Sequence, residues 1–175
     1  MKKMFRVAII IALFGVVVYS QRALIAERVM SKGLESRMGS NIADGFEDGL
    51  HLALCGAGGP MPAPKASGPC VVVIAGERMF VVDAGTDGVR NMARMGLAAG
   101  DIEAVFLTHF HSDHMDGLGE MATLRWVSAA NSQPLPVYGP KGVRKVVAGF
   151  NEAYAMDVQY RHDHHGDTVA PVSGA

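Results

Sequence analysis

The sequence lacks a strong charge of either sign, a Cys-x-x-Cys pair and an apolar run long enough for a comfortable membrane span. The formal net charge of −1 and a hydrophobic content of 49% argue against disorder and against general affinity for nucleic acid. With only two cysteines and no Cys-x-x-Cys spacing, a cysteine-based zinc site is not expected. The 175 residues leave room for one domain with a real core.

A nucleotide-binding P-loop is also absent. The segment 56–64 is rich in glycine, but no Lys-Ser or Lys-Thr pair follows it at the start of a helix. Its prolines lack backbone donors, so the segment is neither helix nor central strand. We therefore expect a loop there that does not bind nucleotide phosphates.

The N-terminus has the pattern of a targeting segment. Basic residues precede the apolar run 7–19, and small residues near Ser20 suit cleavage. We predict that residues 1–20 are a signal peptide and that the protein is exported to the periplasm. An uncleaved membrane anchor over 4–19 and a buried N-terminal helix are the alternatives.

Residues 21–49 are predicted to form a helical stalk followed by a polar connector, and residues 50–175 a folded domain. Strands and helices alternate in that domain, which is typical of an α/β architecture. Residues 76–77 read as a two-residue hairpin turn. The expected strands are 50–55, 70–75, 78–82, 104–107 and 135–138, and the expected helices are 86–96, 116–129 and 142–154.

The densest chemistry lies in the stretch 108–117, directly after the apolar run 104–107. If that run is a strand, its carboxyl end and the following loop can bring several side chains to one point. Imidazole and carboxylate are good ligands for zinc, and four donors on one loop can serve two ions. A polar surface loop is the alternative interpretation. The candidate ligands are His109, His111, Asp113 and His114.

The spacing His-x-His-x-Asp-His at these four positions resembles the signature of the metallo-β-lactamase superfamily. The resemblance implies an αββα sandwich with two zinc ions in a complete domain. In that family the first two histidines bind one zinc, and the aspartate and last histidine bind the other. It further implies that a water or hydroxide bridges the ions and attacks the substrate, with Asp113 orienting it as the catalytic residue.

The order of the glycine-rich loop, the hairpin and Val-Val-Asp-Ala-Gly at 81–85 is similar to the ribonuclease Z and arylsulfatase-like branch, including exported members. In that branch the residue matching Asp83 braces the metal loop and is not a ligand. Such bracing is physically reasonable, since a ligating histidine needs its other nitrogen fixed. A helix cap or turn residue is the alternative role for Asp83.

The resemblance implies a zinc-dependent hydrolase that cleaves a phosphate or sulfate ester of a small molecule through a metal-bound hydroxide. RNA is not the expected substrate, because export and a slightly acidic charge disfavour it. Hydrolysis of a β-lactam, lactone or thioester is the alternative reaction. A truncated, non-catalytic remnant that binds metal weakly is the alternative from a different class.

The family supplies further ligands from its second half, so this chain resembles the N-terminal half of the domain. A second histidine cluster, with His162, His164 and His165, is expected in a solvated or partner-facing loop, with metal ligation as the lesser alternative. Half a sandwich leaves an apolar sheet face uncovered, which favours homo-oligomers. The residues expected on that face are Val71, Val73, Phe80 and Val81 or their neighbours.

Cys55 and Cys70 end one predicted strand and begin the next. In an exported protein two cysteines are more often paired than free, and neighbouring strands bring them within bridging distance. A disulfide is one expectation, and two buried free thiols are the other.

Overall fold

The computed structural model describes residues 18–26, 28–29, 41–61 and 63–175, which fall into the units Met1–Met38 and Gly39–Ala175. In the first unit, 18–26 and 28–29 are helical. The core of the predicted signal or anchor lies outside the described residues. No helix in the described part of the chain is both long and apolar enough to cross a membrane.

The second unit is built on one mixed sheet of five strands in the order β1-β2-β3-β4-β5. The first three strands are antiparallel neighbours, whereas β4 and β5 run parallel to β3. This confirms the predicted α/β architecture and the hairpin, in which Gly76 has a φ of 59°. The strands are β1 Leu50–Gly56, β2 Cys70–Ala75, β3 Arg78–Val82, β4 Ile102–Phe106 and β5 Val137–Tyr138.

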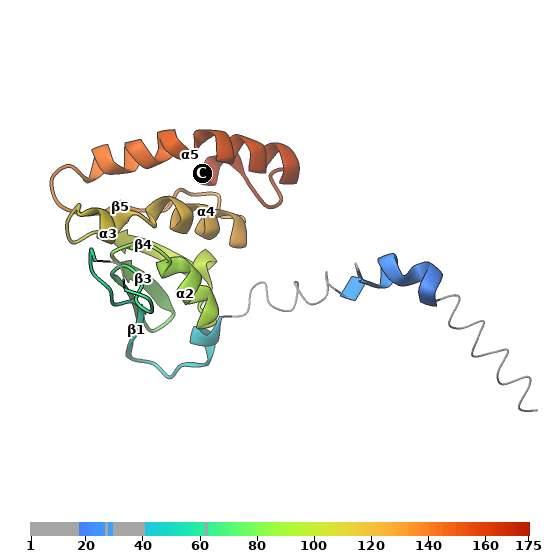
Figure 1. Cartoon of the computed structure of the whole chain (residues 1–175), viewed down its shortest axis with the longest axis horizontal. Helices are drawn as coiled ribbons and strands as arrows, with labels where there is room; N and C mark the ends of the chain where they lie inside the picture. Colours follow the sequence, from blue (N-terminus) through green and yellow to red (C-terminus); the bar gives the residue numbers. More distant parts are fainter. Residues whose placement is uncertain (1–17, 27, 30–40, 62) are drawn as a thin grey trace, which may run out of the picture. The chain divides into compact units, whose positions relative to one another are not determined.

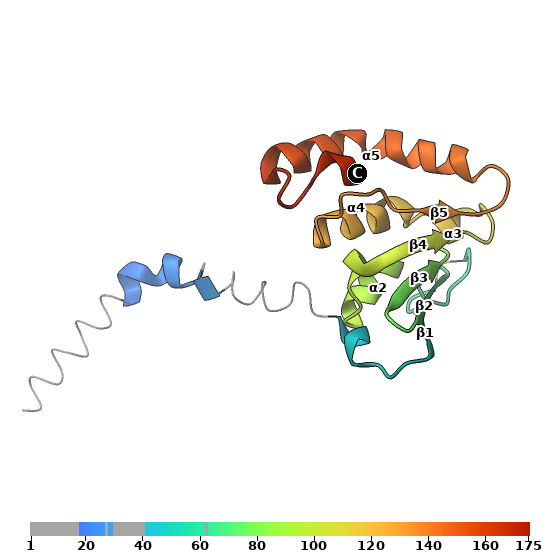
Figure 2. The same ribbon diagram turned by 180° about the vertical axis from the view of Figure 1, so that it is seen from behind.

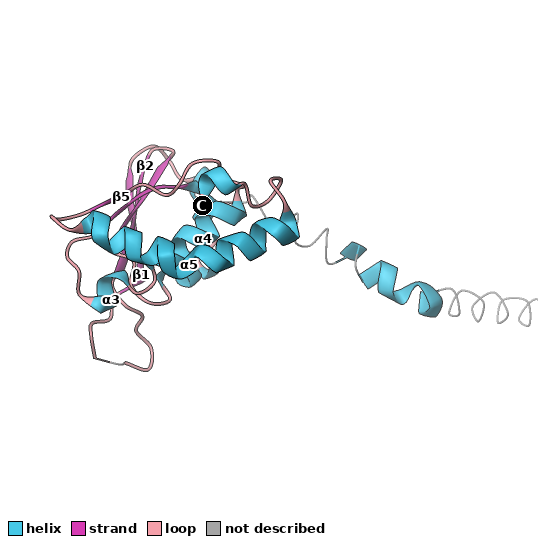
Figure 3. Ribbon diagram, turned by 90° about the horizontal axis from the view of Figure 1, so that it is seen from above, coloured by secondary structure: helices cyan, strands magenta, loops and turns pink. Residues whose placement is uncertain are grey.

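Helices lie on one side of this sheet, with α4 between the strands and α5 (Figures 1 and 2). Viewed from above, α5 lies over α4 (Figure 3). The helices are α2 Gly88–Arg94, α3 Ser112–Met115, α4 Leu118–Ser128 and α5 Val143–His165, with 3-10 turns at η1 Ile42–Gly45, η2 Ala99–Asp101 and η3 Val172–Gly174. Their inward side chains form the core with the sheet: Val72, Ile74, Met79, Val81, Val89, Met92, Ile102, Val105, Leu118 and Met121.

The opposite face of the sheet is apolar and open. The strand register aligns one row across all five strands, namely Leu54, Val71, Val82, Phe106 and Tyr138. Leu54 is 67% exposed, Phe106 41% and Tyr138 55%. The rings of Phe106 and Tyr138 stack with centroids 5.2 Å apart. In the part of the chain that the structure describes, one sheet and one layer of helices of the expected αββα sandwich are therefore present, as a partial domain.

One residue expected on the open face lies on the other one. Val71, Val73 and Phe80 alternate onto the open face and are half-buried, whereas Val81 is 0% exposed and belongs to the core. Successive side chains of a strand point to opposite faces, so Val81 cannot share a face with Phe80. The prediction for Val81 was wrong for this reason.

The segment before β1 belongs to the same unit as the sheet. The backbone N–H of Ile42 donates to the carbonyl oxygen of Gly96 at 3.0 Å, and Asn41 Nδ2 donates to Asp101 Oδ2 at 2.7 Å. Asn41 also caps η1 through its side chain. The described residues of this unit therefore include the segment before β1.

The last helix is longer than predicted. The sequence predicted a helix over 142–154 followed by a loop, but α5 runs to His165. No glycine or proline interrupts residues 155–165, and Gly166 with a φ of 66° then ends the helix. The second histidine cluster therefore lies on the last turn of a helix, and the expectation of a loop was wrong.

A buried arginine ties α4 to the two parallel strands. Arg125 is 9% exposed and donates from Nε to the carbonyl oxygen of Ile102 at 3.0 Å and from its Nη1 to that of Gln133. Burial lowers the pKa of Arg125, because desolvation disfavours the charged form. The guanidinium thereby links the start of β4 to the segment that leads into β5.

Candidate metal site

The site forms where two parallel neighbours, β3 and β4, end at the same edge of the sheet. Val82 pairs with Phe106 in the ladder, and the Asp83 N–H donates to the Phe106 carbonyl oxygen at 2.9 Å. Asp83 then adopts a φ of 60°, an unusual conformation that turns the chain away from the sheet. As a result its carboxylate faces Thr108, whose N–H donates to Asp83 Oδ1 at 2.8 Å.

The Asp83 carboxylate binds two further groups of the histidine loop, residues 108–117. Its Oδ2 accepts from His114 Nδ1 at 2.8 Å, and the Thr108 hydroxyl lies 3.0 Å from Oδ1 and 2.9 Å from Oδ2. The same hydroxyl is 3.0 Å from His109 Nδ1. Asp83 is only 6% exposed, so this carboxylate is buried with partners on each oxygen. These contacts hold the histidine loop against Asp83, as the bracing role predicted for Asp83 requires.

The four predicted ligands form two facing pairs. His109 Nε2 lies 3.0 Å from His111 Nδ1, and His114 Nε2 lies 3.6 Å from Asp113 Oδ2. The ring centroids of His109 and His114 are 4.1 Å apart, so the two pairs are adjacent. Asp113 and His114 sit on α3, a short helix where the sequence had suggested a loop.

These residues fit a metal in their chemistry, since each pair turns two neutral or anionic donors toward one point. The two donors of a pair are fewer than the three that a catalytic zinc ion usually keeps. Among the residues that the structure describes, no group of three or more His, Cys, Asp or Glu is close enough to hold an ion. The chain thus presents two partial sets of ligands.

Backbone contacts without side chains hold the loop in place. The Ala84 N–H donates to the His114 carbonyl oxygen, and the Gly117 N–H donates to that of Ala84, both at 2.8 Å. A Cβ at Gly68 or Gly85 would lie 2.6 or 2.5 Å from the Asp113 carbonyl oxygen. Only glycine permits such a close approach of three loops. The roles of these glycines and of Thr108 are not apparent from the sequence alone.

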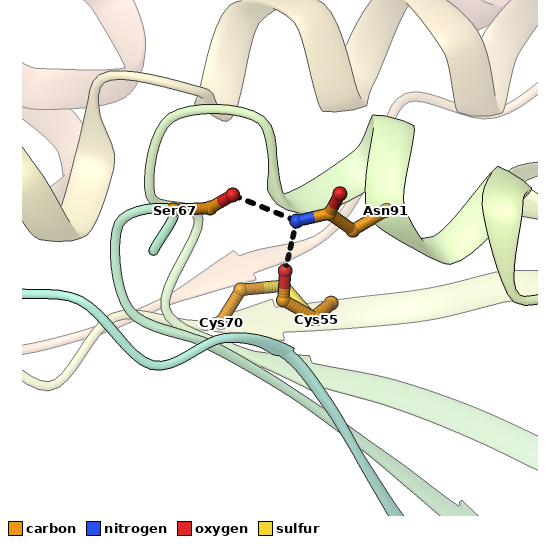
Figure 4. The surroundings of a disulfide bond; sticks show 4 residues. All are labelled: Cys55, Ser67, Cys70 and Asn91. Atoms are coloured by element: carbon orange, nitrogen blue, oxygen red, sulfur yellow. Dashed lines mark hydrogen bonds between the residues drawn. A yellow bond between two sulfur atoms is a disulfide. The ribbon is translucent and has the colours of Figure 1, made fainter. Parts of the chain in front are cut away.

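A disulfide lies behind the glycine-rich loop. Cys55 and Cys70 are joined through their sulfur atoms and are 1% and 0% exposed. Asn91 Nδ2 donates to the Cys55 carbonyl oxygen at 2.7 Å and to Ser67 Oγ at 2.8 Å (Figure 4). The bridge and Asn91 together fix both ends of the loop that contains Gly68, and Gly68 contacts the histidine loop.

The second histidine cluster is not brought to this site. His162 Nδ1 donates to the Ala170 carbonyl oxygen at 3.0 Å and lies 3.7 Å from Asp167 Oδ1. His164 and His165 are exposed, with ring centroids 4.6 Å apart. Within the described part of the chain, none of the three joins a group able to hold a metal.

An apolar cavity of about 320 Å³ lies between α4 and α5. Trp126, Phe150 and Tyr154 line it, and none of the candidate ligands does. Trp126 Nε1 donates to the Pro171 carbonyl oxygen at 2.8 Å, which holds the C-terminal segment against this cavity. The cavity is thus separate from the candidate ligands.

The chain is similar to ribonuclease Z proteins in sequence and in fold. Ribonuclease Z of Mycobacterium bovis (strain BCG / Pasteur 1173P2) is 40% identical over 124 residues, which cover 70% of this chain and 44% of that protein. Human tRNase Z, short form, superposes with a TM-score of 0.54 at 27% identity, over 59% of this chain and 40% of that one. A long-form RNase Z from yeast reaches 0.56 at 19% identity, over 70% and 18%, which shows likeness of fold alone.

The chain spans less than half the length of the curated relatives it matches. The family model described as "Metallo-beta-lactamase superfamily" matches residues 64–174. That range contains Asp83, the histidine loop and the sheet edge from which they emerge. This chain belongs to the metallo-β-lactamase superfamily.

Proposed function

We propose that this chain carries part of the active site of a zinc-dependent hydrolase that cleaves phosphate esters. The observation that supports this most strongly is the pair of facing donor sets, His109 with His111 and Asp113 with His114. A buried carboxylate braces both sets from behind, directly at His114 and through Thr108 at His109. A surface loop rich in histidine has no need of such bracing.

In this proposal His109 and His111 hold one zinc ion, and Asp113 and His114 hold the second. Bound zinc lowers the pKa of a water molecule toward neutrality and stabilises negative charge on a phosphoryl oxygen. His109 and His114 contribute fixed ring orientations, because their Nδ1 atoms are already bonded. Asp113, whose side chain is 13% exposed, would orient the attacking water.

A phosphate ester is favoured over the other substrates that this fold accepts because the relatives reported above are named ribonuclease Z and tRNase Z. RNA is therefore one candidate phosphodiester, although the net charge of −1 gives no general attraction to it. A small-molecule phosphate ester is the substrate we favour. A sulfate ester and a β-lactam serve as comparison substrates in the test.

The chain alone is expected to be a poor hydrolase. Two protein donors per ion leave each zinc loosely held, since catalytic zinc usually keeps three. The open sheet face adds a tendency to associate. We therefore expect turnover of aryl phosphate esters barely above background for the 175-residue chain.

The test is a chimera in which the 175 residues are followed by the portion of the Mycobacterium bovis relative that this chain does not match. Hydrolysis of an aryl phosphodiester, an aryl sulfate and a β-lactam would be compared with and without added zinc and chelator. The proposal predicts chelator-sensitive diesterase activity that the matched variant Asp113→Asn abolishes. A folded, zinc-loaded chimera without diesterase activity, or with equal activity in Asp113→Asn, contradicts it.

Export of the protein is a separate proposal that rests on the sequence of residues 1–20. A buried disulfide is compatible with it, because disulfides persist mainly outside reducing compartments. Fusing residues 1–40 to a reporter that is active only outside the cytoplasm tests the proposal. A well-expressed but silent fusion would argue against export.

A further inference from the structure

The hydrogen bonds behind the histidine loop all lead to one carboxylate, that of Asp83. This observation rests on the proposed function and deepens it by assigning a role to Thr108. Asp83 bonds His114 directly, whereas His109 is reached only through the Thr108 hydroxyl. We propose that Thr108 is a positioning residue that relays the charge of Asp83 to His109, so that one carboxylate sets the tautomers of both histidines.

The direction of each hydrogen bond follows from the chemistry of the groups. An ionised carboxylate only accepts, so the single proton of the Thr108 hydroxyl points to Asp83. The hydroxyl oxygen is then left to accept, and its partner at 3.0 Å is His109 Nδ1. His109 must therefore carry its proton on Nδ1, with the lone pair on Nε2.

The same reasoning applies to His114 without an intermediary. Its Nδ1 lies 2.8 Å from Asp83 Oδ2, so Nδ1 donates and the lone pair again falls on Nε2. In both rings the free Nε2 is the atom that faces the other donor of the pair, His111 Nδ1 or Asp113 Oδ2. The carboxylate thus prepares both rings for a metal before any metal binds.

The backbone makes Thr108 suitable for this relay. Its N–H is fixed to Asp83 Oδ1 at 2.8 Å, so the hydroxyl cannot swing far from the carboxylate. The positive φ of Asp83 holds the carboxylate toward β4, and aspartate and asparagine tolerate that conformation better than most residues. Serine can replace the hydroxyl of Thr108, whereas valine keeps the branched shape without it.

The test reads the tautomers in the metal-free 175-residue protein, at a pH where the rings are neutral. Nitrogen-15 chemical shifts distinguish an Nδ1–H from an Nε2–H ring, and single His→Gln variants assign the signals. The wild type is expected to show Nδ1–H at His109 and His114. Thr108→Val should move His109 toward Nε2–H and leave His114 unchanged. Thr108→Ser should resemble the wild type, and Asp83→Asn should disturb both rings.

Metal affinity supplies a second readout that does not depend on turnover. Thr108→Val should weaken zinc binding about tenfold, at the lower end of the effect of losing an outer hydrogen-bond partner. Thr108→Ser should restore it. A wild-type His109 with its proton on Nε2, or a Thr108→Val protein with an unchanged His109 signal, would overturn the relay. Because no substrate is present, these outcomes are distinguishable from a failure of the proposed hydrolase activity.

Discussion

The chain contains two histidine clusters of similar composition, and the structure treats them differently. At the first, His109 and His114 have their outer nitrogens bonded to Thr108 and to a buried carboxylate. At the second, only His162 has a backbone partner in addition to a distant carboxylate, and its neighbours His164 and His165 are exposed. Hydrogen bonds orient the rings of the first cluster, whereas the second cluster lies at the end of a helix.

Residue type alone therefore does not identify a metal site. The hydrogen-bond partners that orient each side chain must be considered as well. A histidine on the last turn of a helix is adequately explained by its favourable interaction with the helix dipole. A histidine whose outer nitrogen faces a buried aspartate has a preferred tautomer and a free lone pair. Four predictions test the contrast, beginning with the largest effect.

Removing one ligand of the first cluster should have the greatest effect. His111→Ala should weaken zinc binding by more than about 100-fold, since losing even an outer partner costs about 10- to 100-fold. The matched variant His164→Ala, at the exposed second cluster, should bind zinc like the wild type. Competition with a chromogenic chelator measures both. Equal affinities in the two variants would end the distinction between the clusters.

The disulfide supports only the first cluster, through the loop that carries Gly68. Replacing Cys55 and Cys70 by alanine should lower the free energy of unfolding by about 3 kcal/mol, because the bridge constrains a loop with a sequence separation of 15. Urea denaturation measures this loss. Titration of unfolded, unreduced wild type should find no free thiol, and two free thiols would refute the pairing in solution.

The third largest effect is expected from a methyl group added at Gly85. Gly85→Ala places a Cβ 2.5 Å from the Asp113 carbonyl oxygen, so the loops must separate at a cost of about 1–3 kcal/mol. Zinc affinity should fall with it. Gly149→Ala on α5 is the control, since a Cβ there meets nothing within 4 Å and should stabilise the helix by about 0.5–1 kcal/mol. A neutral Gly85→Ala would mean the loops are not tightly packed.

The smallest effect is expected at the second cluster itself. His162→Ala removes the hydrogen bond to the Ala170 carbonyl oxygen and should cost about 1 kcal/mol of stability. Zinc binding should not change. Thermal unfolding in the presence and absence of zinc separates the two quantities. A loss of zinc-dependent stabilisation in this variant would give His162 a role in the metal site.

Much of the site was predictable because its information is local. The four ligands lie within six residues after an apolar run, and the hairpin is marked by its turn residues. The role of Thr108 was not predictable in this way. It depends on β3 and β4 being parallel neighbours, which brings Asp83 beside a residue far along the chain.

The errors have similar causes. The run 79–82 is apolar at every position, so its pattern does not say which face Val81 occupies. The contacts of Gly68 and Gly85 depend on three loops meeting, and no single loop reveals them. The length of α5 is visible as a stretch without glycine or proline, whereas the lack of an apolar strand before the second histidine cluster favours a loop.

We propose that the loop His109–His114 holds metal as two separate pairs. Cobalt binding to the 175-residue chain, followed by absorption and elemental analysis, tests it most directly. We expect that the double variant His109→Ala with His111→Ala loses one ion, and that the double variant Asp113→Ala with His114→Ala loses the other. Replacing His162, His164 and His165 together should lose none. Metal that survives both loop variants, or disappears with the triple variant, would contradict the assignment.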